Sequence, residues 1–84
     1  MEWSDEELAR RVAHDLPEPD RVPALALIMS YGSAAHEREG PRVRRVLLQS
    51  CGGSLDRLRR LVAMAQIDYR DILTRDPGPD GSFR

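Results

Sequence analysis

The stretch that decides the fold runs from Leu55 to Arg75 and reads LDRLRRLVAMAQIDYRDILTR. It contains neither proline nor glycine, the residues that most often interrupt a helix. Apolar residues recur in it at alternating steps of three and four, which places them on one side of a helix. They are Leu55, Leu58, Val62, Ala65, Tyr69 and Ile72. The pattern predicts one long helix over residues 55–75, with shorter helices packed against its apolar face.

The first helix is predicted over residues 5–16. Ser4 and Glu7 have the spacing of a capping box, in which each side chain satisfies a free backbone N–H at the start of a helix. Pro17 ends the helix because proline lacks an N–H and restricts the residue before it.

A second helix is predicted over residues 21–31, with Asp20 as its N-cap and Pro23 in its first turn. Its residues are apolar nearly all round, which is typical of a helix buried on every side. The sequence therefore predicts that this helix lies in the middle of the fold.

Residues 33–40 are predicted to form a loop, and the third helix to span residues 41–51. A start near Ala34, with a distortion at Pro41, is the alternative for this helix. Gly52-Gly53 ends it, and a serine at position 54 can cap the next helix. So tight a turn predicts that the last two helices form an antiparallel hairpin.

Together these elements predict an all-α fold, a small four-helix bundle over residues 1–75. Residues 76–84 hold two prolines and two glycines and little that could pack, so they are predicted to be a disordered tail. The predicted core consists of Leu8, Val12, Leu25, Ile28, Val43, Leu47, Leu58, Val62, Ala65, Tyr69 and Ile72.

The composition, 40% hydrophobic and 32% charged, is that of a soluble domain. The longest nearly apolar run is too short to cross a bilayer, and the acidic N-terminus does not resemble a signal peptide. A single cysteine, Cys51, cannot form an internal disulfide, so we expect a reducing cytoplasm. All thirteen basic residues are arginine, which indicates a GC-rich bacterial genome.

The charges are unevenly distributed along the chain. Residues 1–35 hold seven acids and three arginines, a net charge of −4, whereas residues 36–60 hold three acids and seven arginines, a net charge of +4. The basic segment supplies the candidate interaction residues Arg38, Arg42, Arg45, Arg57 and Arg60. It also suggests nucleic-acid binding by a helix-turn-helix-like pair around Gly52, although the overall charge of −1 argues against a dedicated nucleic-acid binder.

No set of residues predicts catalysis, a cofactor or a metal ion. The two histidines, His14 and His36, lack a second ligand at a metal-binding spacing. The glycines at 52 and 53 lack the strand and lysine of a phosphate-binding loop. A small-ligand or enzyme site near Tyr31, His36 and Arg38 is a further alternative.

Several motifs resemble those of small uncharacterised bacterial helical proteins. They are Tyr31-Gly32, Glu37-Arg38, the stretch SLDRLRRLV at 54–62 and the stretch DYRDIL at 68–73. The resemblance covers about residues 28–73, with Ser54-Leu55 where those proteins usually have Asp-Leu. It implies a helical fold and no particular activity.

The sequence therefore predicts a non-enzymatic interaction or regulatory module. The apolar face of residues 55–75 is broad for three short helices to cover. A partner protein or a second copy of the chain is expected to cover the rest.

Overall fold

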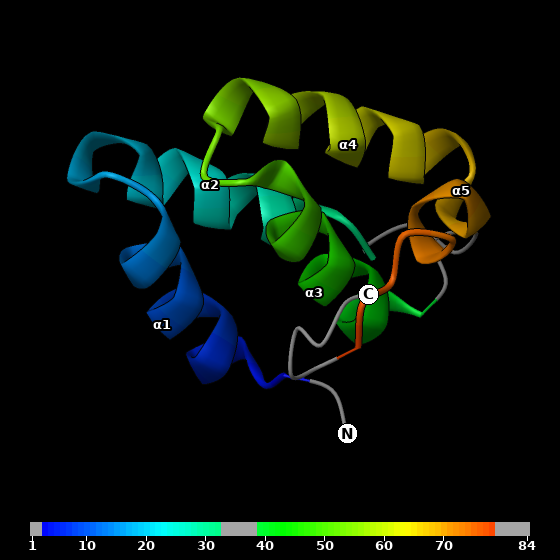
Figure 1. Ribbon diagram of the computed structural model, residues 1–84, viewed down its shortest axis with the longest axis horizontal. Coiled ribbons are helices and arrows are strands. Elements are labelled where there is room, and N and C mark those ends of the chain that lie inside the picture. The colour runs from blue at the N-terminus through cyan, green and yellow to red at the C-terminus, as the bar shows by residue number, and fades with distance from the viewer. Residues whose placement is uncertain (1–2, 33–38, 79–84) are drawn as a thin grey trace.

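The structure, a computed structural model, describes residues 3–32 and 39–78. In these residues it is all-α, as predicted, and its five helices pack as a small bundle (Figure 1). They are α1 (Asp5–Asp15), α2 (Glu18–Ser30), α3 (Gly40–Cys51), α4 (Leu55–Ile67) and α5 (Tyr69–Leu73). Residues 33–38 of the predicted loop at 33–40, and residues 79–84 of the predicted tail at 76–84, fall outside the described residues.

Two serines begin helices as the sequence predicts. Ser4 Oγ accepts a hydrogen bond from the Glu7 backbone N–H at 3.2 Å, and Ser54 Oγ accepts one from the Arg57 N–H at 3.2 Å. Gly52, with φ of 60°, and Gly53, with φ of 79°, turn the chain between α3 and α4. Glycine adopts such left-handed angles without the steric cost that a side chain adds.

Helix α2 begins earlier than predicted, at Glu18, so Asp20 is inside the helix and does not cap it. Pro19 lies at the start of the first turn, where backbone N–H groups have no acceptor within the helix. The missing N–H of proline therefore costs nothing there. The turn is closed by a hydrogen bond from the Asp20 N–H to the Pro17 carbonyl oxygen at 2.9 Å.

The central helix is α3 and not, as predicted, the second helix. Helix α3 contacts each of the other four helices, which surround it in Figure 1. Six of its twelve residues are buried: Val43, Arg45, Val46, Leu47, Leu48 and Cys51. Helix α2 buries only Ala24 and Ile28 of its thirteen residues, so its apolar composition does not make it central.

The predicted long helix over 55–75 is wrong, because the chain bends at Asp68. This residue has an extended backbone, and its side chain accepts a hydrogen bond from the Arg70 N–H at 3.1 Å, which caps α5. A straight helix of that length would span about 31 Å, which equals the longest dimension of the molecule, 31 Å. The bend instead folds α5 back, and Ile72 is buried where α5 packs against α3 and α4.

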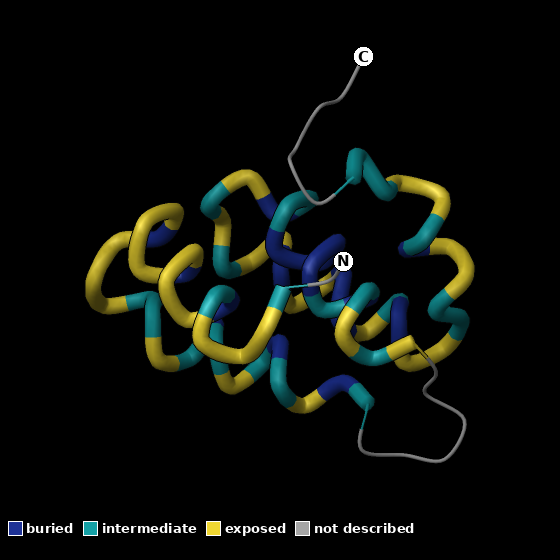
Figure 2. Tube along the Cα trace, turned by 90° about the horizontal axis from the view of Figure 1, so that it is seen from below, coloured by how far each residue is buried: buried dark blue, intermediate teal, exposed yellow. Residues whose placement is uncertain are grey.

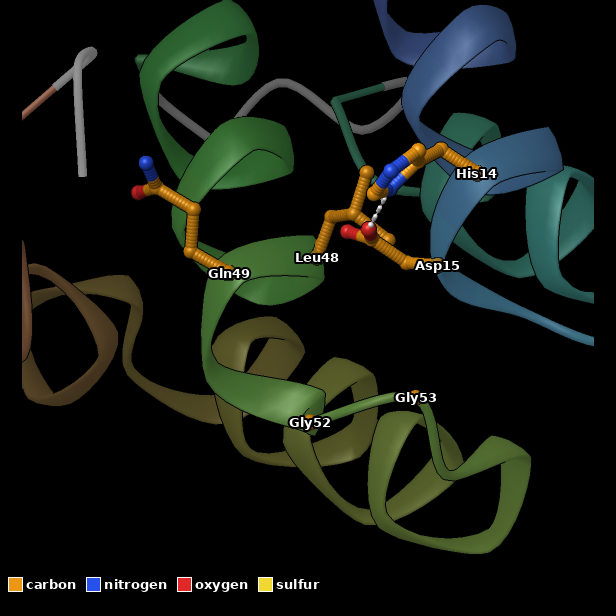
Figure 3. Close-up of a pocket in the computed structure, with 6 residues that line it drawn as sticks. All are labelled: His14, Asp15, Leu48, Gln49, Gly52 and Gly53. Carbon is orange, nitrogen blue, oxygen red and sulfur yellow. Dashed lines mark hydrogen bonds and ion pairs between the residues drawn. The ribbon is translucent and has the colours of Figure 1, made fainter.

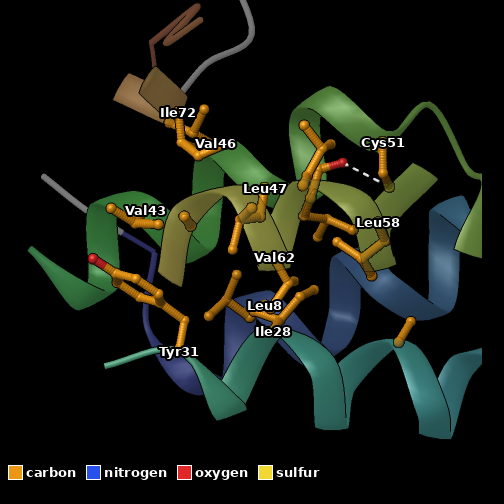
Figure 4. Close-up of a cluster of buried hydrophobic side chains, with 14 of the residues drawn as sticks. Leu8, Ile28, Tyr31, Val43, Val46, Leu47, Cys51, Leu58, Val62 and Ile72 are labelled. Carbon is orange, nitrogen blue, oxygen red and sulfur yellow. Dashed lines mark hydrogen bonds between the residues drawn. The ribbon is translucent and has the colours of Figure 1, made fainter. Parts of the chain in front are cut away.

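The core lies between α3 and the four helices around it (Figure 4). All the predicted core residues are buried except Leu25 and Tyr69, which are half-buried and pack against the core. Leu16, Ala24, Tyr31, Val46, Leu48, Cys51 and Leu61 complete it. In the part of the chain described, no helix is long and apolar enough to span a membrane.

Candidate interaction site

The outer face of α2 is an apolar surface left open in a single copy of the chain. It consists of Val22, Ala26 and Met29, which share one side of the helix at steps of four and three. Val22 is 79% exposed and Ala26 is exposed, whereas Met29 is half-buried and also packs against the core. No charged residue occurs from Val22 to Ser30. Contiguous apolar patches on a protein surface often mark interaction sites.

This face is open because α2 packs on its opposite side. Ala24 and Ile28 are buried against neighbouring helices, and the contacts of α2 are with α1, α3 and α4. Figure 2 shows α2 along the lower edge of the molecule, just before the grey segment, with exposed positions on its outside. The half-buried Leu25 lies between the two sides and extends the apolar surface toward the core.

Charged side chains lie near both ends of α2. Glu18 and Asp20 lie in its first turn. At its C-terminal end the guanidinium of Arg44 donates from Nε and Nη2 to the Tyr31 carbonyl oxygen, at 3.0 and 2.7 Å. Arg44 thus neutralises the carbonyl groups at the end of the helix. The apolar face therefore lies between the acidic first turn of α2, which Arg21 follows, and the guanidinium of Arg44 from α3.

Two of the predicted interaction arginines come together on α3, where they bind Asp76. Arg45 donates from Nη1 and Nη2 to the two carboxylate oxygens at 2.7 and 3.0 Å, and Arg42 Nε donates to Oδ2 at 2.9 Å. Hydrogen bonds from Arg45 hold the pKa of the Asp76 carboxyl well below its usual range, and the Gly78 N–H and Arg42 add to this effect.

Arg45 is a buried residue, although the sequence suggests a surface position for it. Its side chain is 1% exposed, and Nη1 also donates to Gln49 Oε1 at 2.9 Å. Arg45 is thus part of the interior, and it offers no free surface to a partner while Asp76 is bound to it. Residues 76–78 are also held against α3, which corrects the predicted start of a disordered tail at residue 76.

The remaining predicted arginines do not join this cluster. Arg57 and Arg60 are exposed on the outside of α4, and Arg38 lies outside the described residues. Between them on α4, Arg59 pairs with Asp56 at 3.2 Å.

The predicted ligand site near Tyr31 is not supported by the described residues. Tyr31 is fully buried, and its ring lies in the core beside Val43 in Figure 4. His36 and Arg38, the other two residues of this prediction, fall in the segment that the structure does not describe.

A hollow of about 390 Å³ lies elsewhere, where the end of α1 meets the turn between α3 and α4 (Figure 3). His14 Nδ1 and Asp15 Oδ1 are 2.7 Å apart on its α1 side, and Gly52 and Gly53 lie on the other. The nearby Cys51 thiol is buried and donates to the Leu48 carbonyl oxygen, and burial raises its pKa. A thiol with a raised pKa is a poor nucleophile.

Asp76 is the residue of this region that sequence reasoning missed. An aspartate before Pro-Gly is a signal for a local turn, and the Gly78 N–H does donate to Asp76 Oδ1 at 2.8 Å. Its partners lie 31 and 34 positions earlier in the chain, a separation that no local pattern reveals.

Within residues 3–32 and 39–78, no group of three or more His, Cys, Asp or Glu residues is placed to hold a metal ion. Comparison of the chain with protein-family models, with curated proteins and with solved structures gives no match.

Proposed function

We propose that this protein is a non-enzymatic interaction module that docks through the outer face of α2. The observation behind the proposal is the uncharged run from Val22 to Ser30, in which Val22 and Ala26 are exposed to solvent. A helix that is apolar nearly all round is most stable when covered on both sides. A partner on the outer face would supply the missing cover.

The partner that fits this surface best is a second copy of the chain. In a twofold dimer the same patch faces itself, and an apolar patch can do so without burying a charge. If the two α2 helices run antiparallel, Glu18 and Asp20 of one copy approach Arg44 of the other. The acidic and basic ends then attract across the interface, which favours this arrangement over a parallel one.

Light scattering after size exclusion, at two protein concentrations, tests this proposal. The chain has a mass of 9.5 kDa, and we expect twice this mass at the higher concentration. Ala26→Glu should raise the dimer dissociation constant at least about tenfold, because it buries an unpaired charge from each copy. Ala63→Glu is the matched control, since Ala63 is an exposed alanine within another helix, α4.

The comparison between the two glutamate variants decides the outcome. A dimer that Ala26→Glu weakens and Ala63→Glu preserves supports docking through α2. A monomer at both concentrations, or equal effects of the two substitutions, contradicts self-association through this face.

A second candidate function is nucleic-acid binding through α4. Arg57, Arg59 and Arg60 are exposed in its first two turns, after a sharp turn from α3. This is where a helix-turn-helix protein makes its base contacts. Titration of a DNA duplex at low salt, where phosphate contacts are strongest, tests it with Arg57→Ala/Arg60→Ala as the comparison. Absence of binding by the unaltered chain rejects this candidate.

The setting we infer is the cytoplasm, where a reduced thiol is stable. The support is Cys51, which is the single cysteine of the chain and is buried as a free thiol.

A further inference from the structure

One side of α3 forms a carboxylate-binding site, and the side chain of Asp76 occupies it. Arg42, Arg45 and Gln49 follow one another at steps of three and four, so they share a side of the helix. The two arginines hold the Asp76 carboxylate through three hydrogen bonds of 2.7 to 3.0 Å. Gln49 Nε2 donates to the Gly78 carbonyl oxygen at 2.8 Å. The site therefore contacts both a side chain and the main chain of the segment Asp76–Gly78.

This set of contacts has the chemistry of peptide recognition. A guanidinium that meets both oxygens of one carboxylate gives charge and direction together, and lysine could not reproduce this geometry. The hydrogen bond from Gln49 to the Gly78 carbonyl oxygen fixes the backbone two residues after Asp76. The Asp76 side chain also bonds the Gly78 N–H, which shapes the segment into a turn that fits the site.

The bound segment lies at the border of the fold. It follows the last helix, and its backbone is joined to α5 by a bond from the Asp76 N–H to the Leu73 carbonyl oxygen at 3.2 Å. The side chain of Arg42 is 40% exposed and that of Asp76 14%, whereas Arg45 forms the buried floor. The site is therefore most open to solvent on the side of Arg42.

We propose that α3 carries a binding site for an aspartate-containing peptide of the Asp-Pro-Gly type, and that the chain fills this site with its own residues 76–78. The same segment from another chain then competes for Arg42 and Arg45. A short tether gives the internal segment an effective concentration of order millimolar. A competing peptide is therefore excluded until the internal segment is released or altered.

The test uses the full-length chain with Asp76→Ala and a synthetic peptide of residues 74–78, Thr-Arg-Asp-Pro-Gly, with both ends blocked. Binding is followed by calorimetry and by the shift in thermal midpoint. We expect the variant to bind the peptide at least about tenfold more tightly than the unaltered chain, whose site is occupied. A peptide with asparagine in place of aspartate is the control and should not bind, because it lacks the charge that the two arginines require.

The design holds even if Asp76→Ala weakens the fold. A ligand that binds only the folded chain raises its thermal midpoint, so the aspartate peptide should restore the stability that the variant loses. Adding Arg42→Ala to the variant should weaken peptide binding at least about tenfold. The peptide should then restore less of the lost thermal stability. These residues lie on α3, so the result does not depend on the outer face of α2.

Three results would overturn the proposal. The first is no binding and no restoration at about 10 mM peptide, well above the expected effective concentration. The second is equal binding of the aspartate and asparagine peptides. The third is equal binding to the unaltered chain and to Asp76→Ala, which would place the peptide at another surface.

Discussion

At the scale of single residues, Arg45 and Asp76 determine where the end of the described chain lies. A buried arginine is costly unless its charge is paired and its N–H groups are bonded. Asp76 and Gln49 both accept hydrogen bonds from Arg45. Arg42 places a second cation beside the Asp76 carboxylate. From the sequence these residues look like a basic helix face and a flexible tail. Their pairing depends on the fold, and the pattern of residues 42–49 therefore predicts the helix and not its partner.

The close approach of the α3–α4 turn to α1 gives a prediction at this scale. Gly52 and Gly53 both have positive φ, where alanine costs about 1–2 kcal/mol. A Cβ at Gly53 would also lie 2.9 Å from the Asp15 carbonyl oxygen, whereas at Gly52 the nearest atom is Arg57 Nη1 at 4.0 Å. We expect Gly53→Ala to lower the free energy of unfolding about 1–3 kcal/mol more than Gly52→Ala, in urea titrations. Equal losses would contradict the close approach.

At the scale of the helices, the sequence predicts which residues face the core better than it predicts where helices end. Leu58, Val62 and Ala65 are buried as their spacing predicts, and this side of the pattern continues correctly to Ile72. Periodicity cannot reveal the bend between them, because α5 presents its apolar residue to the same core as α4. The signal that was available is Asp68, since aspartate favours helix starts over helix interiors.

The buried side of α4 gives a prediction for this helix. Leu58 is fully buried, while Ile67 on the same helix is 86% exposed. Leu58→Ala should lower the free energy of unfolding by about 2–5 kcal/mol, through lost burial and the cavity that remains. Ile67→Ala, the control, should change it by less than about 0.5 kcal/mol. Thermal and urea unfolding would measure both, and a Leu58→Ala protein as stable as Ile67→Ala would contradict this account of the core.

At the scale of the whole molecule, α2 has the apolar composition of a buried helix but lies at the surface of a single copy of the chain. Its sequence predicts burial all round, and the structure leaves Val22 and Ala26 in solvent. The sequence predicts an uncovered apolar face on residues 55–75, and Ile67 on α4 is indeed 86% exposed. Helix α4 packs against α2, α3 and α5 and leaves Ile67 exposed near its end, whereas α2 at the edge leaves Val22 and Ala26 exposed. A dimer through α2 would reconcile its composition with its surroundings.

The most direct measurement of this claim is disulfide cross-linking of a full-length Ala26→Cys protein under mild oxidation. Ala26 lies midway along the outer face of α2, so a twofold antiparallel dimer brings the two introduced thiols within the short distance that a disulfide requires. The native Cys51 is buried, so it contributes little background. Ala63→Cys, on the exposed side of α4, measures random collision.

Rapid formation of a covalent dimer by Ala26→Cys, and little or none by Ala63→Cys, is the result that this account predicts. Cross-linking of both variants at the same rate, or of neither, would contradict an interface on the outer face of α2.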